Sequence, residues 1–333
     1  MKRAMITGIT GQDGSYLAEH LLDQGYEVWG FVHGKLNEHV SRIRRLLDDH
    51  IRLVYGDLLH ADSILSAIEK VQPEEVYNLA AVTHVPTSWE HAELTAEVTG
   101  LGALRVLEAI RLCSGISDSR TPAGGQIKFW QASSSEMYGD SHEHSQNELT
   151  PLRPVTPYGA AKMYAHMLTQ NYRESYGMYA VSGIMFNHES PRRSPEFLSR
   201  KVSLGVARIK LGQDRQLRLG TLSPRRDWGF AGDYVRVMPL MLAQKQPEDY
   251  VIGTGVTHSV EEFVSRAFLV AGLDWHRYVV TDTAYIRPTE ARELCADPSK
   301  AVKRLGWNPT VNFDQLVEMM VESDISSSSV ESD

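Results

Sequence analysis

The first half of the chain alternates short apolar runs with stretches in which apolar residues recur every three or four positions. The runs predict buried strands at 3–7, 27–32, 52–55, 75–79, 128–132 and 180–186. The periodic stretches predict helices at 15–23, 40–47, 61–71, 92–112 and 158–176. Continuous apolar strands separated by helices indicate a parallel sheet that is covered on both faces.

The pattern becomes less regular after Asn187, where proline-containing loops and short strands accompany helical stretches at 196–210 and 261–271. This change indicates a smaller C-terminal lobe that binds substrate. We expect two units that interrupt each other along the chain: a first domain of residues 1–186 plus about 228–256, and a lobe of 187–227 plus 257–322.

Two further segments lack the apolar residues of a core. Residues 117–126 are rich in Ser, Gly and Pro, which predicts a surface loop. Residues 323–333 are serine-rich and acidic, which predicts a disordered tail.

The composition narrows the class of protein. A net charge of -8 disfavours nucleic-acid binding, because the phosphate backbone requires a basic surface. Cys113 and Cys295 show no metal-ligand spacing and predict two reduced thiols. No apolar run reaches the ~18 residues of a membrane span, and a short strand follows Met1 instead of a signal sequence. We therefore expect a soluble cytoplasmic protein without a metal site.

Gly8, Gly11 and Gly14 lie in a turn between the first strand and the first helix. Glycines allow a tight turn and let the backbone approach a pyrophosphate at the positive end of the helix. At this point of a strand–helix alternation, the cluster is typical of a doubly wound, Rossmann-type α/β domain that binds a dinucleotide. We expect cofactor contacts at this turn and at the ends of later strands, namely Gly8, Thr10, Gly11, Gln12, Asp13, Gly14, Asp57, Leu58, Leu79, Ala80 and Ala81.

The second predicted strand ends at Val32 without the acid that usually binds the ribose 2′-hydroxyl of NAD. His33 and Lys35 follow, and either could meet a 2′-phosphate. Arg42 is a third candidate, although a solvated surface charge is the simpler interpretation of that arginine. The missing acid favours NADP over NAD.

Tyr158 and Lys162 are four residues apart at the start of a helix, so their side chains share one face. A cation beside a phenol lowers its pKa toward the working range, and lysine can also hold the nicotinamide ribose. Ser134 belongs to a serine cluster that closes another strand, where a hydroxyl could orient a reacting oxygen toward the tyrosine. The order of glycine turn, serine cluster and Tyr–Lys pair makes a simple turn cap the weaker interpretation.

Glu136 distinguishes between several reactions. A 4-epimerase or a reductase acting on nucleotide sugars needs no carboxylate here, whereas a dehydratase needs a base for the proton on C5 of a 4-keto sugar. The simpler alternative is a surface glutamate in the loop. A non-catalytic NADP-binding regulator on the same fold is disfavoured because Tyr158 and Lys162 are both intact.

Six segments carry a family resemblance: 6–19, 131–139, 157–162, 186–193 with the run Asn-His-Glu-Ser-Pro-Arg-Arg, 226–229 and 287–290. Over nearly the whole chain, up to about Asp324, the sequence resembles the GDP-mannose 4,6-dehydratases, which are extended short-chain dehydrogenases/reductases. The resemblance implies that Ser134, Glu136, Tyr158 and Lys162 are catalytic and that Tyr158, Lys162, His188 and Arg193 contact the cofactor. It implies substrate contacts at Thr83, Ser134, Glu136, Asn187, Lys201, Arg226, Arg287 and Glu290.

The implied reaction converts GDP-mannose to GDP-4-dehydro-6-deoxymannose and water by internal hydride transfer through bound NADP. Tyr158 would take the proton of O4 and Glu136 that of C5, with Glu136 itself or Ser134 as the acid for the leaving water. The resemblance also implies a homodimer or homotetramer. The chain departs from the family after the second strand, where His33, Gly34, Lys35 and Leu36 replace the usual arginines and serines.

Overall fold

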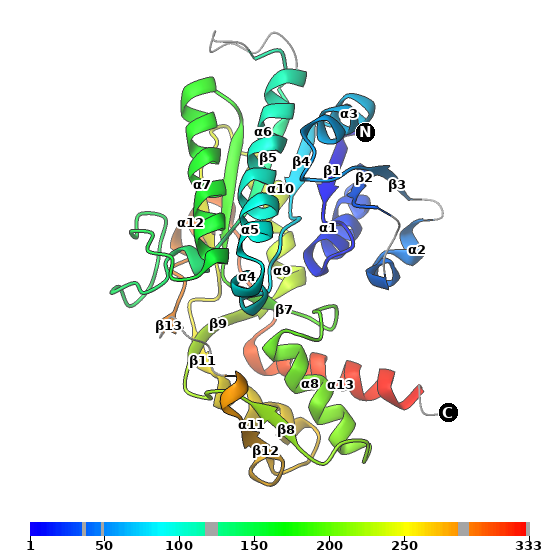
Figure 1. Cartoon of the computed structure of the whole chain (residues 1–333), viewed down its shortest axis with the longest axis vertical. Coiled ribbons are helices and arrows are strands. Elements are labelled where there is room, and N and C mark those ends of the chain that lie inside the picture. Colours follow the sequence, from blue (N-terminus) through cyan, green and yellow to red (C-terminus); the bar gives the residue numbers. More distant parts are fainter. Residues whose placement is uncertain (35–37, 48–49, 117–125, 286–292, 331–333) are drawn as a thin grey trace.

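The structure is a computed structural model of the 333-residue chain. It describes residues 1–34, 38–47, 50–116, 126–285 and 293–330 (Figure 1). Lys35, Arg287 and Glu290 therefore lie outside the described residues, as does the expected surface loop except for Gln126.

A seven-stranded parallel sheet forms the centre of the larger domain. Its strand order is β10-β6-β5-β4-β1-β2-β3. The strands are β1 (Arg3–Thr7), β2 (Glu27–Val32), β3 (Ile51–Tyr55), β4 (Glu75–Asn78), β5 (Lys128–Ser134), β6 (Ala180–Met185) and β10 (Tyr250–Ile252). The order reverses direction between β1 and β4, which is the point where doubly wound sheets bind ligands. The predicted doubly wound α/β fold is confirmed.

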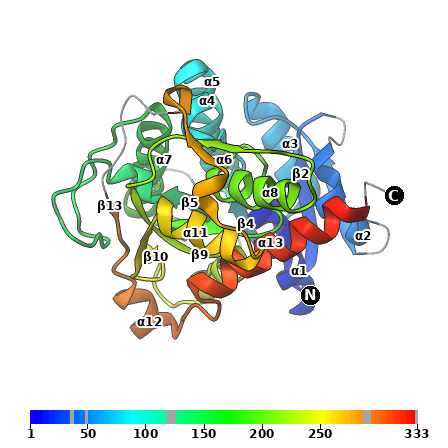
Figure 2. The same cartoon turned by 90° about the horizontal axis from the view of Figure 1, so that it is seen from below.

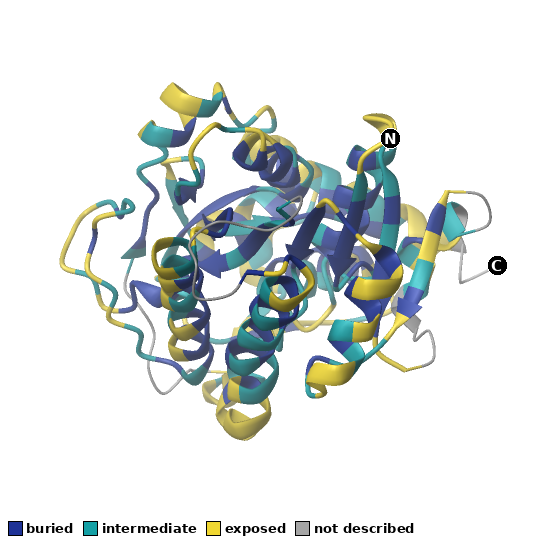
Figure 3. Ribbon diagram, turned by 90° about the horizontal axis from the view of Figure 1, so that it is seen from above, coloured by how far each residue is buried: buried dark blue, intermediate teal, exposed yellow. Residues whose placement is uncertain are grey.

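Helices cover both faces of this sheet, so its strands are buried between them (Figures 1 and 3). One face packs against α1 (Gln12–Asp23), α9 (Ala231–Val235) and α10 (Val237–Leu242). The other packs against α3 (Ala61–Val71), α6 (Gly102–Cys113) and α7 (Pro157–Tyr176). This double covering is why the strand sequences are continuously apolar and not alternating.

Shorter elements complete this domain. The single helix expected at 92–112 is observed as α5 (Ala92–Thr95), a π-helical segment (Ala96–Leu101) and α6, with α4 (Val85–Glu90) before them. The helix expected at 40–47 is a 3-10 helix (Glu38–Arg42) followed by α2 (Arg44–Leu47).

The smaller lobe is built around α8 (Leu198–Lys210), α11 (Val260–Val270) and α13 (Phe313–Val330), which pack together (Figure 2). Its largest sheet joins β7 (Asn187–Glu189), β9 (Arg225–Phe230), β11 (Thr257–Ser259) and β13 (Glu293–Leu294). A second sheet pairs β8 (Leu217–Leu219) with β12 (Val279–Thr281). In contrast to the expected boundary, α12 (Ser299–Leu305) packs against the core of the larger domain through Ala301.

The predicted disordered tail is wrong for residues 323–330, which continue α13. Asp324 is fully buried, with one carboxylate oxygen 2.7 Å from the Arg200 guanidinium and the other accepting a 2.6 Å hydrogen bond from Ser203. The serines after it are helical, and several of their hydroxyls donate to carbonyl oxygens of the preceding turn, as Ser326 Oγ does to that of Glu322. Serine content alone therefore misrepresented this segment.

Candidate active site

The glycine turn brings the ends of β1 and β4 close to the start of α1. Gly8 has a φ of +71°, and a Cβ there would lie 2.9 Å from the Ala80 nitrogen. A Cβ on Gly14 would lie 2.3 Å from the Gly8 carbonyl oxygen. Thr7 Oγ1 accepts hydrogen bonds from the backbone nitrogens of Leu79 and Ala80, both at 3.1 Å. The turn therefore needs glycine for close backbone packing. Because the glycines have no side chains, a ligand can approach the backbone N–H groups at the start of α1.

A groove runs along this turn and suits an extended dinucleotide. It is lined by the residues expected from the sequence, Gly8, Thr10, Gly11, Gln12, Asp13, Gly14, His33, Asp57, Leu58, Leu79, Ala80 and Ala81. His33 Nε2 lies 3.2 Å from Asp57 Oδ2 at the end of the groove beyond β2. Arg42 also lines it and donates to the Thr10 carbonyl at 3.0 Å and to Ser194 Oγ at 3.1 Å.

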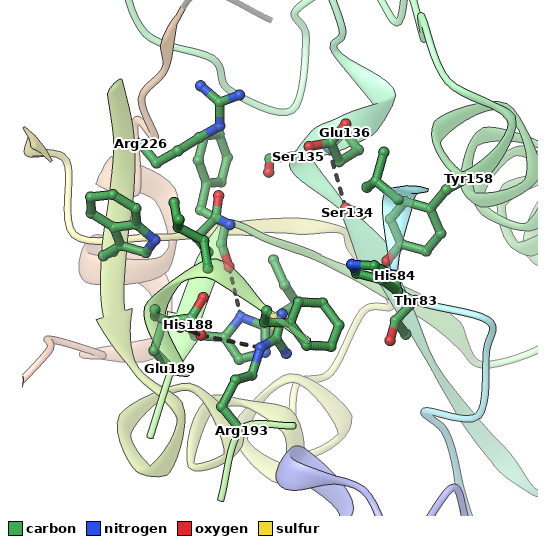
Figure 4. Close-up of a pocket in the computed structure, with 18 of the residues that line it drawn as sticks. Thr83, His84, Ser134, Ser135, Glu136, Tyr158, His188, Glu189, Arg193 and Arg226 are labelled. Carbon is green, nitrogen blue, oxygen red and sulfur yellow. Dashed lines mark hydrogen bonds and ion pairs between the residues drawn. The ribbon is translucent and has the colours of Figure 1, made fainter. Parts of the chain in front are cut away.

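A second cavity continues from the groove, and both are bordered by Asp13, Leu79 and Arg193. Ser134, Glu136 and Tyr158 lie on one side of it, with His188, Arg193 and Arg226 on the other (Figure 4). Thr83, Lys162 and Asn187 also line it. The structure thus brings the four expected catalytic residues together with most of the expected substrate contacts.

Ser134 and Glu136 occupy a short turn at the carboxyl end of β5. Ser134 Oγ accepts a hydrogen bond from the Glu136 backbone nitrogen at 3.2 Å and so caps the 3-10 helix Ser135–Met137. The start of α7 packs closely against this turn, since a Cβ on Gly159 would lie 2.6 Å from the Glu136 carbonyl oxygen. Thr156 caps α7 by accepting from the Gly159 nitrogen at 3.0 Å. These contacts place Tyr158, in the first turn of α7, beside Ser134.

Burial dominates the ionisation of the Tyr–Lys pair. It raises the pKa of Tyr158 well above its usual range, although the Ser134 side chain and the Arg193 charge act in the opposite direction. Burial lowers the pKa of Lys162 to about 8, against the charge of Asp13. Lys162 Nζ donates to the Ala132 carbonyl at 2.7 Å and lies 5.7 Å from the centre of the Tyr158 ring. The prediction that Lys162 lowers the pKa of Tyr158 is therefore wrong for the protein without bound ligands.

His188 links the lobe to the glycine turn. Its Nδ1 lies 2.6 Å from the Phe186 carbonyl oxygen and its Nε2 lies 2.8 Å from Asp13 Oδ2. Burial acts to lower the pKa of His188, but the charge and hydrogen bond of Asp13 outweigh it and raise that pKa. Burial likewise acts to raise the pKa of Asp13, yet His188 lowers it to about 2. Because both ring nitrogens face oxygen acceptors, the imidazole is held as a cation.

The cavity wall opposite the tyrosine is cationic. Arg193 lies over the Phe197 ring, 3.6 Å from its centre, with Nε 3.1 Å from Glu189 Oε2. Arg226 is buried on β9 and donates to the Arg225 carbonyl at 2.7 Å. Guanidinium groups at such a site suit a diphosphate, which they can bind with paired hydrogen bonds.

Lys201 is the described candidate that does not line the cavity. Its Nζ lies 3.3 Å from the centre of the Tyr285 ring, and burial lowers its pKa against the charge of Asp282. Tyr285 is the last described residue before the segment that holds Arg287 and Glu290.

Two further lining residues were not expected from the sequence, although one of them belongs to the serine cluster at the end of β5. Ser133 and His84 line the cavity beside Ser134 and Thr83, and the His84 ring packs edge-on against Phe197 at 5.4 Å. Within the described residues no group of His, Cys, Asp and Glu side chains could hold a metal ion. None of the helices described here is long and apolar enough to cross a membrane.

Comparisons with known proteins agree with this geometry. Residues 5–320 match the model of the family described as GDP-mannose 4,6 dehydratase. GDP-mannose 4,6 dehydratase 1 of Arabidopsis thaliana is 48% identical over 97% of this chain and 90% of its own length. The human GDP-mannose 4,6 dehydratase is 46% identical over 97% of this chain and 91% of its own length.

The fold is also that of solved nucleotide-sugar enzymes. The UDP-glucose 4-epimerase of Thermus thermophilus, solved in complex with NAD, superposes with a TM-score of 0.82. That alignment covers 97% of this chain and 98% of the epimerase, at 27% identity. With a family model spanning nearly its full length and relatives close to half identical, the chain belongs to the GDP-mannose 4,6-dehydratase family.

Proposed function

We propose that this protein is a hydro-lyase that converts GDP-mannose to GDP-4-dehydro-6-deoxymannose and water. The observation that carries the proposal is Glu136, which lies in one cavity with Ser134, Tyr158 and Lys162. Oxidation at C4 requires the last three residue types, but only a dehydratase also needs a carboxylate to remove the proton of C5.

The chemistry follows from these side chains. Tyr158 accepts the proton of O4, and the side-chain hydrogen bond of Ser134 and the charge of Arg193 favour its phenolate against burial. A nicotinamide cofactor held in the groove along the glycine turn would supply the redox chemistry, namely the oxidation of C4 and the later reduction of C6. Glu136 takes the C5 proton, the C6–O bond breaks, and water leaves with a proton from Glu136 or Ser134. C5 then regains a proton, which balances the one taken from O4.

The cationic wall supports a nucleoside diphosphate sugar as the substrate. Arg193 and Arg226 line the cavity opposite Tyr158 (Figure 4), and Asn187 adds an amide to its lining. The GDP-mannose assignment draws on the names of the curated relatives.

A nicotinamide cofactor suits the groove along the glycine turn, and the solved epimerase of this fold binds NAD. We propose NADP for this chain. Among the described residues, β2 ends without an acid, and Arg42 places a guanidinium in the groove beside Thr10. A guanidinium favours the extra phosphate of NADP, whereas NAD enzymes usually offer a carboxylate.

We also propose that the protein is cytoplasmic and forms a homodimer or homotetramer. Both cysteines are free thiols, which suits a reducing compartment. Large apolar side chains are exposed on α4, α5 and α7, helices that pack against one another, namely Trp89, Leu94, Tyr164 and Met167, of which Leu94 also lines the cofactor groove. Exposed apolar side chains on adjoining helices are typical of an association surface.

Incubation of the purified protein with GDP-mannose, without added cofactor, tests the function. Mass spectrometry is expected to show a product lighter by one water, formed over many turnovers without accumulation of reduced cofactor. A requirement for added NADPH would indicate a reductase instead. If no dehydrated product forms even with NADP⁺ supplied, the proposed reaction or substrate is wrong.

A further inference from the structure

Polar residues repeat every four positions along the face of α7 that meets the sheet. Tyr158 and Lys162 reach the active-site cavity, whereas His166 and Gln170 continue the same row beneath it. Side chains four residues apart on a helix lie one above the other. His166 is 4% exposed, and the proposed chemistry does not use it.

A continuous chain of hydrogen bonds connects this row with the cavity. His166 Nδ1 lies 3.0 Å from Ser133 Oγ, and Ser133 lines the cavity next to Ser134. Gln170 Nε2 lies 3.1 Å from His166 Nε2 and donates to Asp249 Oδ2 at 2.9 Å. Asp249 also accepts two hydrogen bonds from Arg173, at 2.9 and 2.8 Å, and one from the Ser182 nitrogen at 2.7 Å.

These contacts determine where each proton lies. Arg173 holds Asp249 as an anion: burial acts to raise the pKa of Asp249, but Arg173 lowers it. The carboxylate can only accept, so the Gln170 atom that faces it is the amide nitrogen. That nitrogen can only donate to His166, which must therefore accept at Nε2. A neutral imidazole that accepts at Nε2 carries its hydrogen on Nδ1 and donates to Ser133 Oγ.

Burial supports a neutral ring. It lowers the pKa of His166, assisted by the charge of Arg173 and opposed by that of Asp249. With His166 donating to the Ser133 oxygen, the hydroxyl hydrogen of Ser133 is free to point elsewhere, and the cavity lies beside it.

We propose that His166 is a positioning residue that orients the Ser133 hydroxyl as a hydrogen-bond donor toward the sugar in the active-site cavity. This inference rests on the proposed function. Ser133 is the residue that touches the substrate, and His166 acts through it. Lys162 and His166 form hydrogen bonds with successive residues of β5, Ala132 and Ser133. These two bonds fix α7 against β5 and so also keep Tyr158 beside Ser134.

The polar residues of this hydrogen-bond chain indicate that His166 has a specific role and does not merely fill space. A buried imidazole and a buried carboxylate cost free energy unless each of their polar atoms is paired. Here every link is paired within 3.1 Å. An apolar residue at 166 would fill the space between α7 and β5 without that requirement, but it would leave the Ser133 hydroxyl free to rotate.

Four variants test the proposal by steady-state kinetics with GDP-mannose. His166→Phe and Ser133→Ala are each expected to lower kcat about 10-fold while KM stays within about 2-fold, because positioning acts in the transition state. The double variant is expected to be no worse than either single variant, since both remove the same interaction. His166→Asn keeps a donor near the Nδ1 position and is expected to recover most of the activity.

A kinetic isotope effect separates positioning from loss of structure. With GDP-mannose deuterated at C4, the effect on kcat is expected to rise in His166→Phe, because a misplaced sugar slows hydride transfer. Wild-type kcat and isotope effect in this variant would overturn the proposal, and so would additive losses in the double variant. If His166→Phe does not fold, His166→Ala, which removes the donor and also reduces the volume, takes its place in the same comparison.

A measurement without substrate distinguishes this inference from the proposed function. In protein with ¹⁵N-labelled histidine, the His166 signal, assigned by its loss in His166→Asn, is expected to show hydrogen on Nδ1 only. It should stay unchanged from about pH 6 to about pH 8, because the ring is held neutral. Hydrogen on Nε2 would refute the inference. Failure of the wild type to dehydrate GDP-mannose would instead refute the proposed function.

Discussion

His188 Nε2 lies 2.8 Å from Asp13 Oδ2, so an ion pair joins the lobe to the first turn of α1 in the larger domain. The same segment adds a second connection, because Gln12 donates to the His188 carbonyl at 3.1 Å. The cofactor groove and the substrate cavity meet at this point. The pairing therefore couples the geometry of the two sites.

This ion pair makes stability depend on pH. The pKa of His188 is raised on folding, so its contribution is complete below about pH 6.5 and is lost as the pH rises through the folded value. Lowering the pKa of Asp13 from 3.8 to about 2 contributes about 2 kcal/mol, which is lost as the pH falls through that range. Urea unfolding of wild type and His188→Gln should therefore differ most between about pH 4 and pH 6.5. A difference that grows toward pH 9 would contradict this assignment.

Glu136→Gln should separate the two halves of the reaction. The amide cannot remove the C5 proton, so kcat is expected to fall about 10²- to 10⁴-fold. Oxidation at C4 remains possible, and reduced cofactor should accumulate on the enzyme when GDP-mannose is added, visible by its absorbance. Tyr158→Phe is the control, because it blocks the first step and should show neither product nor reduced cofactor. If Glu136→Gln turned over at the wild-type rate, Glu136 would not be the base that takes the C5 proton.

Arg42→Gln should weaken binding of NADP about 10-fold and leave binding of NAD nearly unchanged. A charged hydrogen bond to a phosphate is worth about 1.5 to 3 kcal/mol, and only NADP carries the 2′-phosphate. Titration of cofactor-free protein with each dinucleotide measures the effect. Arg44→Gln is the matched control, because Arg44 is exposed and does not line the groove. Equal losses of affinity for NADP and NAD would show that Arg42 contacts a part of the dinucleotide other than the 2′-phosphate.

Asp324→Ala should lower the free energy of unfolding by about 3 kcal/mol. The change leaves the Arg200 guanidinium without the carboxylate that lies 2.7 Å from it, and breaking a buried pair is costly. Glu322→Ala, on an exposed position of the same helix, should change stability by less than about 0.5 kcal/mol. Denaturant unfolding of both variants measures these changes. If Asp324→Ala were as stable as Glu322→Ala, the buried pair with Arg200 would contribute little to stability.

Tyr164→Glu should shift the protein toward monomers if the apolar surface of α4, α5 and α7 is the interface. Tyr164 is 42% exposed, and a charge there would be buried without a partner on association. Light scattering coupled to size-exclusion chromatography measures the mass. Leu269→Glu, at a residue 65% exposed on α11, should leave it unchanged. An unaltered mass in Tyr164→Glu would place the interface elsewhere.

Much of the architecture could be predicted from local patterns in the sequence. The apolar runs of β1 and β2 reproduce the observed strands because both faces of a covered parallel sheet are buried. The glycine turn and the Tyr158–Lys162 pair were recognisable because their chemistry depends on short spacings along the chain. Glu136 followed from its position two residues after Ser134.

What only the tertiary structure decided involves residues far apart in sequence. Asp249 reaches His166 through Gln170, and Asp324 pairs with Arg200, but no local period reports such contacts. The pKa of Tyr158 was likewise misjudged, because spacing places Lys162 on its face of α7 without showing that burial outweighs the charge. Periodicity reports how each segment is buried, whereas packing of distant segments determines which polar atoms meet and how strongly solvent is excluded around them.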